Sequence, residues 1–242
     1  MTHFGFRTVR EDEKPSLVGR VFSDVASRYD LMNDLMSLGI HRLWKRAMLD
    51  WLRPGPRMRL LDVGGGTGDI AAGFRARGGG AAVVLDINRA MLASGRDRAI
   101  DRNRVEEIDW VCGDAEALPF PDRSVDAYTI AFCLRNVTHI DAALAEARRV
   151  LRPGGRFLCL EFSQVTAPAL AHLYDVYSFN VLPWLGEKVA GNREAYQYLV
   201  ESIRRFPPKR DLIARMNRVG LERTSYRDLS AGIVALHSGW RL

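Results

Sequence analysis

The stretch LDVGGGTGD, residues 61–69, joins the end of an apolar run to a glycine-rich turn. The run RLLDVG (59–64) predicts a buried strand, and residues 67–77 predict a helix. Glycines at 64, 66 and 68 lie between the two, where they tolerate positive φ and let the backbone pass close to a ligand. The helix start presents N–H groups to electronegative atoms. The stretch therefore predicts a strand–turn–helix unit that holds a ligand.

The spacing of these glycines excludes the common phosphate-binding turns. The dinucleotide fingerprint G-x-G-x-x-G needs a third glycine, but its sixth position is Asp69 counted from Gly64 and Ala71 counted from Gly66. The phosphate-binding loop needs Lys after its last glycine, whereas here Asp69 follows Gly68. A carboxylate at that place repels a polyphosphate. We therefore expect a cofactor without a diphosphate.

Acidic residues end the next two predicted strands. Asp86 lies near the end of AAVVLDI (81–87), 20 residues after Gly66. A carboxylate in that position can accept hydrogen bonds from both hydroxyls of a ribose. Asp114 follows IDWVCG (108–113) and can accept a hydrogen bond from an exocyclic amine. The two acids therefore predict a site for a nucleoside.

Together these residues indicate S-adenosylmethionine as the cofactor. Ala115 and Leu118 follow Asp114 and can lie against an apolar ring such as adenine. The glycines suit a small zwitterion, and the positive sulfonium suits an acidic pocket without phosphate groups. The alternative is that Asp62, Asp86 and Asp114 are ordinary polar loop residues. Three acids at successive strand ends, next to a G-x-G-x-G turn, favour the cofactor.

Strands and helices alternate through most of the chain. Single helices between strands imply parallel pairing with right-handed crossovers, and the last two strands, joined by a short turn, should pair antiparallel. Asn88 can cap the helix after the second strand. The predicted fold is α/β, with a seven-stranded, mostly parallel sheet and one reversed strand. The strands are expected at 59–64, 81–87, 108–113, 124–134, 155–163, 221–228 and 232–240, and the helices at 67–77, 89–101, 140–151 and 210–219.

Two largely helical segments flank this core within a single domain, 1–242. Residues 16–52 show helical spacing and end at Pro54-Gly55-Pro56. Seven aromatic residues in 174–206 favour either a pocket for a long apolar tail or helix packing, and both interpretations stay open. The expected parts are a helical lid (1–53), a cofactor-binding core (59–163), a helical substrate region (164–209), and the last helix with the antiparallel strands (210–242).

The composition is that of an ordinary globular protein, with 242 residues, 47% hydrophobic and 26% charged. This excludes disordered and collagen-like chains, and no run approaches the roughly 18 apolar residues of a spanning helix. The start MTHFGFRTVREDEKP lacks the apolar core of a secretory signal, so we expect a cytoplasmic protein. The three cysteines, Cys112, Cys133 and Cys159, form no C-x-x-C pair. We therefore expect no metal site and no disulfides, with all three cysteines buried near strands.

The formal net charge of +6 comes mainly from arginine, because only four of the 35 basic residues are lysine. An anionic partner, either nucleic acid or an acidic membrane surface, is one explanation. The arginines are spread along the chain, which favours a solvated basic surface. An RNA or DNA methyltransferase is a weaker alternative, because the fourth strand leads into AFCLRN (131–136) and not into an Asn/Asp-Pro-Pro-aromatic turn. We therefore expect no nucleic-acid partner.

Several segments resemble the ubiquinone/menaquinone biosynthesis C-methyltransferases, over nearly all of the chain after about residue 20. GGTGD and RPGG are generic to the wider methyltransferase class, whereas the YDLMNDLMSLGIHRLWK and LRNVT segments are far more specific. The segments are VFSDVASRYDLMNDLMSLGIHRLWKR (21–46), GGTGD (65–69), EALPFPD (116–122), LRNVTHI (134–140), RVLRPGGRFLCLEFS (149–163), YSFNVLP (177–183) and ALHSGW (235–240).

The resemblance implies a class I methyltransferase (Rossmann-like) fold and methylation of a ring carbon of a polyprenylated benzoquinol or naphthoquinol. Carried over by position, it assigns the cofactor contacts to Thr67, Asp86, Asp114 and Ala115, next to Asp62, Gly64 and Gly66 of the turn. Two positions depart from the family pattern. Ala131 stands where a serine is common and cannot donate a side-chain hydrogen bond, and Gly64 stands where alanine is usual.

Methylation of a ring carbon requires a proton to leave a quinol hydroxyl, whose pKa resembles the value of about 10 for tyrosine. Arg135 and Asn136 follow the fourth strand and are the candidate catalytic residues. Arginine is too basic to act as an ordinary base, so we expect Arg135 to stabilise a phenolate or polarise a water, and Asn136 to orient the ring oxygens. Alternatively, Arg135 pairs with a nearby acid.

The lid and the histidines supply further candidates. Tyr29 either covers the cofactor or packs as an ordinary aromatic. The histidines His41, His139, His172 and His237 are candidate bases by residue type.

The expected partner is a polyprenyl quinol. Because such quinols reside in membranes, we also expect peripheral contact with the inner membrane through the aromatic segment and nearby arginines. A quinone-biosynthesis complex and a homodimer stay open. Other small-molecule methyltransferases and a non-catalytic cofactor-binding protein are the competing functions.

Overall fold

The computed structural model describes residues 1–25, 33, 34, 37, 39–101, 108–163, 165, 184, 187, 188 and 193–242. Its centre is a seven-stranded sheet in the order β5-β4-β3-β6-β7-β9-β8. Strand β9 runs antiparallel to both of its neighbours, and the other strand pairs are parallel, which confirms the predicted topology with one reversed strand. The strands of the sheet are β3 (Leu60–Val63), β4 (Ala82–Asp86), β5 (Ile108–Cys112), β6 (Val125–Ala131), β7 (Leu151–Phe162), β8 (Glu222–Leu229) and β9 (Val234–Arg241).

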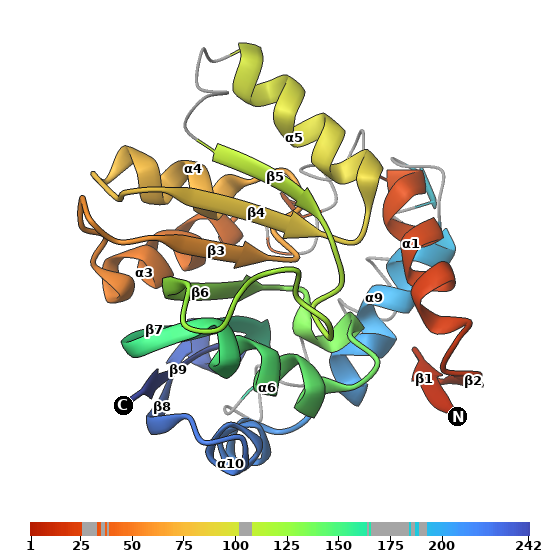
Figure 1. The fold of residues 1–242 in the computed structure, drawn as a ribbon. Helices are drawn as coiled ribbons and strands as arrows, with labels where there is room; N and C mark the ends of the chain where they lie inside the picture. The colour runs from red at the N-terminus through yellow and green to blue at the C-terminus, as the bar shows by residue number, and fades with distance from the viewer. Residues whose placement is uncertain are drawn as a thin grey trace.

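Helices cover both faces of this sheet, as Figure 1 shows. Helices α3 and α4 bury side chains on one face, and α6 and α10 on the other. The helices are α1 (Lys14–Val25), α3 (His41–Leu52), α4 (Asp69–Ala76), α5 (Arg89–Asp101), α6 (Ile140–Val150), α9 (Arg193–Arg205) and α10 (Lys209–Arg218), with 3-10 turns η3 (Leu134–Asn136) and η6 (Ser230–Gly232).

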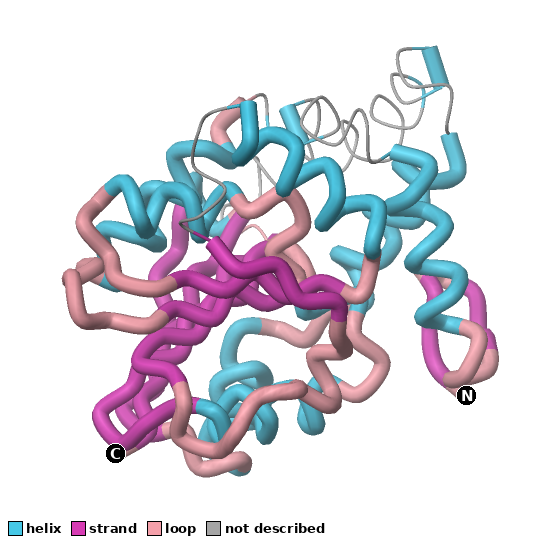
Figure 2. Tube along the Cα trace, turned by 45° about the horizontal axis from the view of Figure 1, so that its top comes forward, coloured by secondary structure: helices cyan, strands magenta, loops and turns pink. Residues whose placement is uncertain are grey.

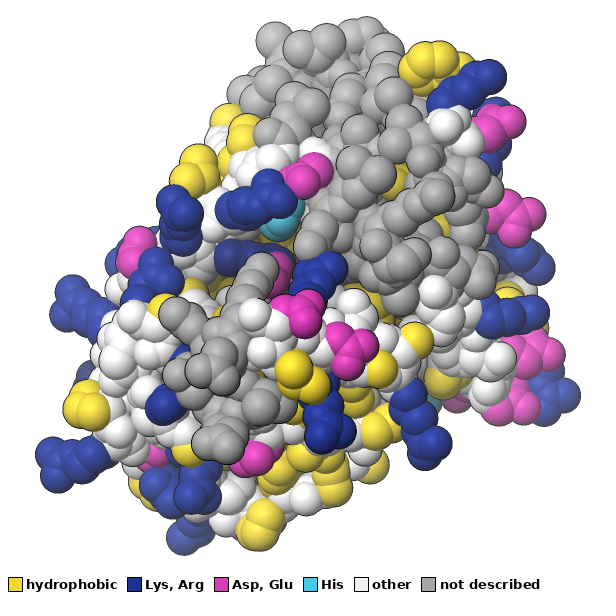
Figure 3. All heavy atoms as spheres, turned by 90° about the horizontal axis from the view of Figure 1, so that it is seen from above, with side chains coloured by type: hydrophobic (Ala, Val, Ile, Leu, Met, Phe, Trp, Pro, Cys, Tyr) yellow, Lys and Arg dark blue, Asp and Glu magenta, His cyan; other side chains and the backbone are white. Residues whose placement is uncertain are grey.

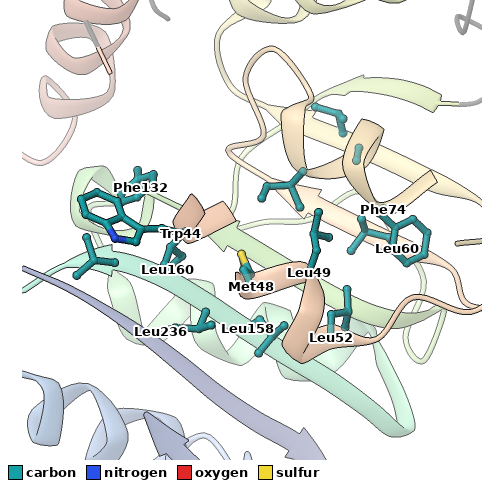
Figure 4. Close-up of a cluster of buried hydrophobic side chains, with 14 of the residues drawn as sticks. Trp44, Met48, Leu49, Leu52, Leu60, Phe74, Phe132, Leu158, Leu160 and Leu236 are labelled. Carbon is teal, nitrogen blue, oxygen red and sulfur yellow. The ribbon is translucent and has the colours of Figure 1, made fainter. Parts of the chain in front are cut away.

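The hydrophobic core has two layers because successive residues of a strand point to opposite faces. In β3, Leu60 packs in the layer under α3 and α4, and Leu61 packs in the layer under α6 and α10. Figure 4 shows the first layer, in which Trp44 and Met48 of α3 lie over leucines of the sheet. Each such side chain contributes about 1.5–3 kcal/mol when fully buried. This packing fixes the central strands and therefore the positions where they end.

The N-terminal part of the chain lies at the carboxyl edge of the parallel strands. Figures 1 and 2 both place α1 at this edge, beside a small antiparallel hairpin, and Figure 1 also places α9 there. The hairpin consists of β1 (Thr2–Phe4) and β2 (Arg7–Val9), and it was not predicted from the sequence. Phe4 of the hairpin stacks on Tyr198 of α9, with ring centroids 4.2 Å apart. The hairpin is therefore part of the wall around the edge where the sequence places the ligand.

Three details refine the predictions from sequence. In the described part of segment 16–52, α1 and α3 are separate helices with further helical residues at 33, 34 and 37, and Gly39 has a positive φ of 77° in the turn before α3. Cys112 is exposed, so the prediction that all three cysteines are buried was wrong: the last residue of β5 faces outward at the end of the strand. Asn88 caps α5 as predicted, since its Oδ1 accepts from the Ala90 N–H at 2.9 Å.

The surface carries many separate basic side chains. In Figure 3 the dark blue Lys and Arg side chains are scattered over the face seen from above, with acidic ones between them. The edge strand β8 is mostly exposed and has a register shift between Glu222 and Ser225. Among the described residues, no helix combines the length and apolar character that a membrane-crossing helix needs.

Candidate cofactor and substrate site

A pocket with about 820 Å³ of empty space lies where β3, β4 and β6 end. In open α/β sheets, ligands bind outside the carboxyl ends of the strands, which is the place where this pocket opens. Helix α1 forms its outer wall through Pro15, Val18, Gly19 and Phe22. The predicted site residues in its lining are Gly64, Gly66, Asp86, Asp114, Ala115 and Asn136.

The glycine turn passes close to its neighbours, and this explains two of its glycines. Gly64 has a φ of 59°, and a Cβ built there would lie 2.1 Å from Cys133 Sγ. Gly66 has a φ of 54°, and a Cβ there would lie 3.0 Å from Met91 Cε. Any side chain at Gly64 would therefore clash as well as strain the backbone. The turn leaves its backbone open to the pocket, as a small zwitterionic ligand requires.

The carboxylate of Asp86 is held in place by backbone donors. Its Oδ2 accepts from the Gly66 N–H at 3.0 Å, and its Oδ1 accepts from the Asn88 N–H at 2.8 Å. Burial raises the pKa of Asp86, and these hydrogen bonds oppose that effect. The hydrogen bonds orient the carboxylate at the pocket wall, and each oxygen retains a lone pair for the hydroxyls of a ribose.

Asn88 connects this acid to the helix that covers the pocket. Its side-chain amide donates to the Gly19 carbonyl at 3.2 Å and to Ser23 Oγ at 3.0 Å, both in α1. The same residue therefore caps α5, supports Asp86 and anchors α1. The sequence predicts only the cap, because the contact with α1 joins residues that are 65 or more positions apart.

Asp114 and Ala115 lie at the other end of the pocket, after β5. Asp114 Oδ1 accepts from the Glu116 N–H at 2.9 Å, which turns the chain back on itself. Ala115 is buried, and Glu116 also lines the pocket. This arrangement places an acceptor next to an apolar surface, as recognition of an adenine requires.

Two predicted contacts, Asp62 and Thr67, lie behind the turn and not in the pocket lining. Asp62 is 1% exposed, its Oδ1 accepts from the Thr129 hydroxyl at 2.7 Å, and burial raises its pKa to about 7. A Cβ at Gly65 would lie 2.7 Å from Asp62 Oδ2, so the carboxylate supports the turn from below. Thr67 is also buried.

Arg135 and Asn136 form the turn η3 directly after β6. Arg135 Nη1 donates to Glu161 Oε2 at 2.9 Å, and both side chains are buried. Burial raises the pKa of Glu161, and the guanidinium opposes this effect. The alternative that Arg135 pairs with a nearby acid is thus confirmed. Asn136 lines the pocket, and its Oδ1 accepts from the Tyr198 hydroxyl at 3.0 Å.

No described histidine lines the cofactor pocket. His41 is buried, its Nδ1 lies 2.9 Å from Ser37 Oγ, and burial lowers its pKa to about 4. Burial also lowers the pKa of His237 in β9 to about 4. His139 is exposed and bonds to Glu116 at 2.7 Å. Tyr29 and His172, the other two candidates, lie outside the described residues.

Some pocket residues had no signal in the sequence. Phe132 and Cys133 follow β6, and Phe132 has an unusual φ of 56° for a residue other than glycine. Its ring packs against Phe162 with centroids 4.9 Å apart, and this contact holds the strained backbone in place. Backbone strain at the end of a strand is a property of the folded chain, so the residue type alone does not reveal it.

Comparisons with known proteins agree with this geometry. The model of the ubiE/COQ5 methyltransferase family matches residues 7–241. The ubiquinone/menaquinone biosynthesis C-methyltransferase UbiE of Paracoccus denitrificans is 59% identical over 242 residues, covering 100% of this chain and 97% of that protein. UbiE of Roseobacter denitrificans is 56% identical with the same coverage. A solved SAM-dependent methyltransferase from Thermotoga maritima, 20% identical, matches with a TM-score of 0.65 over 92% of this chain and 99% of its own, and supports the fold alone. The chain therefore belongs to the ubiE/COQ5 methyltransferase family.

Proposed function

We propose that the protein is the S-adenosylmethionine-dependent C-methyltransferase that methylates the ring of a polyprenylated benzoquinol, a demethylmenaquinol or both in ubiquinone and menaquinone biosynthesis. The observation that carries the proposal is the charge of the pocket. Every charged residue in its described lining is an acid: Asp86, Asp114 and Glu116. Such a pocket attracts a sulfonium cation and repels a diphosphate. The family membership supplies the reaction and the class of substrate.

The pocket residues suit the parts of this cofactor. Asp86 would accept from the ribose hydroxyls, and Asp114 from the adenine amine, with Ala115 against the ring. The backbone of Gly64 and Gly66 would lie beside the amino-acid end, where the missing side chains leave room. When bound, S-adenosylmethionine supplies an electrophilic methyl group. Asp62 and Thr67 support the turn from behind.

The acceptor ring has candidate partners at the end of β6. Asn136 Oδ1 already accepts from Tyr198, which leaves the Asn136 Nδ2 donors for a ring oxygen. Arg135 is held by Glu161, and in that fixed position its positive charge would stabilise the quinolate that forms when a ring hydroxyl loses its proton. Helix α1 forms one wall of the pocket, and exclusion of water from the bound reactants would strengthen these electrostatic interactions.

The direct test is methyl transfer by the purified protein. Incubation with S-adenosylmethionine and a demethylated quinol should yield a product heavier by one methyl group, and NMR should place that methyl on a ring carbon. An O-methyl or N-methyl product, or no turnover with any quinol tested, would contradict the proposal. Deletion of the gene with mass spectrometry of the lipid quinones would then show which quinol accumulates without its methyl.

Membrane contact follows from the apolar tail of such a substrate and is part of the proposal. The start of α3 supports it, because Ile40 and Leu43 are 38% and 57% exposed beside Arg42 and Arg46. Flotation with anionic liposomes at low salt should recover the protein, and Leu43→Glu should weaken this binding. Absence of binding by the unmodified protein would remove this part of the proposal.

A further inference from the structure

A second cavity, with about 960 Å³ of empty space, lies next to the cofactor pocket. The hairpin β1–β2, the residues from 135 to 141 and helix α9 surround it. Val137 and Thr138 line both cavities, so a short piece of chain forms the wall between them. The proposed cofactor contacts Asp86, Asp114 and Ala115 are absent from its described lining, and the family assignment gives it no role.

The charges of this cavity are opposite to those of the cofactor pocket. Asp141 is the only acid in its described lining. The basic residues in that lining are His3, Lys14, Arg135, His139, Arg205 and Arg215. Three of them have acidic partners: Arg135 bonds to Glu161, Arg215 lies 3.1 Å from Asp141, and His139 contacts Glu116 and Glu11.

Lys14 differs from these three. Lys14 is only 6% exposed, and its Nζ donates to the Val137 carbonyl at 2.9 Å. An ammonium has three donors, and this hydrogen bond uses one of them. No carboxylate oxygen of the described residues lies within 4.0 Å of Lys14 Nζ, the limit for an ion pair. The negative charge of Glu116, which lies farther away, raises the pKa of Lys14 and so opposes the effect of burial. A buried charge without a partner is costly, and burial lowers the pKa of Lys14 accordingly.

Arg205 is a second cation of the same cavity, at its exposed side. Its guanidinium lies over the Phe6 ring, 5.7 Å from the centroid, and it forms no ion pair with the described acids. A planar guanidinium with free edge donors suits an oxyanion. The cavity thus combines a buried ammonium and a surface guanidinium with one acid that is already paired.

We propose that this cavity is an oxyanion site in which Lys14 is the buried ligand and Arg205 closes the outer side. An oxyanion there would accept from the two remaining Lys14 donors and neutralise its charge. The positive charges of Lys14 and Arg205 would repel a sulfonium cation such as S-adenosylmethionine from this cavity. Two sources supply the ligand chemistry: a free phosphate or carboxylate, and the ionised ring hydroxyl of the quinol. Only the second source depends on the proposed function.

Inorganic phosphate is the probe for the site itself. We expect phosphate to raise the Tm of the full chain beyond sodium chloride of equal ionic strength, and calorimetry to give a measurable Kd. Lys14→Met should raise that Kd at least tenfold, and Arg205→Met should raise it at least twofold. Lys209→Met is the matched control, because Lys209 pairs with Asp228 at 2.6 Å outside the cavity, and it should leave the Kd unchanged.

Two results would overturn the proposal: a Tm shift no larger than that of chloride, or equal phosphate affinity in the unmodified protein, Lys14→Met and Arg205→Met. Arg205 is exposed, so its variant keeps the test valid if Lys14→Met fails to fold. The source of the oxyanion is then read from kinetics. Phosphate that competes with the quinol indicates the ring oxygen, and phosphate that does not compete indicates a separate anion. Because phosphate binding needs no turnover, the site can be tested even if the proposed reaction fails.

Discussion

The two cavities lie side by side and share a wall, yet they have opposite charge. The cofactor pocket has acids at the ends of strands, each fixed by backbone donors: Asp86 by Gly66 and Asn88, and Asp114 by Glu116. The second cavity has basic residues that come from several separate elements, among them α1, η3 and α9. Arg135 and His139 pair with acids outside it, whereas Lys14 and Arg205 form no ion pair with the described acids. The difference shows that one edge of a sheet can present two cavities of opposite charge that are separated only by a short segment of chain.

The largest expected effect concerns the acid that neutralises a buried cation of the second cavity. Glu161→Ala leaves Arg135 buried without its partner, which should lower the free energy of unfolding by about 3–5 kcal/mol. Glu187→Ala is the control, because its pair with Arg193 is exposed and should contribute about 0–1 kcal/mol. Urea denaturation measures both. Equal effects would show that Arg135 does not depend on this acid.

The next effect tests the glycine turn of the cofactor pocket. Gly64→Ala should cost about 1–3 kcal/mol of stability, because the new Cβ overlaps Cys133 in addition to the strained φ. Gly154→Ala is the control: its φ is +81°, but nothing lies within 4 Å of the new Cβ. The difference in unfolding free energy between the two variants isolates the close contact. Identical losses would mean that backbone strain alone explains Gly64.

Asp86→Ala tests the acid that distinguishes the cofactor pocket. Loss of a buried, charged hydrogen-bond acceptor should weaken the affinity for S-adenosylmethionine by about 1.5–3 kcal/mol, roughly 10- to 150-fold. Calorimetric titration measures this, with Asp97→Ala on the exposed face of α5 as the control. If Asp86→Ala bound within about twofold of the unmodified protein, the assignment of the ribose to Asp86 would be wrong.

The smallest effect concerns His139 in the lining of the second cavity. Hydrogen bonding to Glu116 raises the pKa of His139 above its ordinary 6.5. The stabilisation is therefore complete below about pH 6.5 and is lost as the pH rises through the raised value. It should be small, because the His139 side chain is 54% exposed. His139→Gln should flatten the pH dependence of Tm between about pH 6 and pH 8. An unchanged slope would show that this contact is not coupled to folding.

The sequence predicted the sheet correctly and also that Asp86 and Asp114 lie at strand ends, where both line one pocket. The glycine turn and the alternation of strands with helices were enough to predict the sheet. The acids at strand ends could be predicted because their positions depend only on the neighbouring sequence. The second cavity was not predicted, because its features depend on contacts between distant residues. Lys14 at a helix start has the sequence pattern of a solvated residue, and it becomes a buried charge only when α1 packs against Val137. The pairing of Arg135 with Glu161 stayed open for the same reason, since it depends on β6 lying next to β7.

The edge strand β8 has a consequence for solubility. A strand at the end of a sheet exposes unpaired backbone groups that can extend the sheet into another molecule. In β8 the register shift between Glu222 and Ser225 interrupts the regular pairing, and exposed charged side chains such as Arg223 and Glu222 would have to lose water if a second copy paired there. The same strand thus completes the sheet and makes edge-to-edge pairing of two molecules unfavourable.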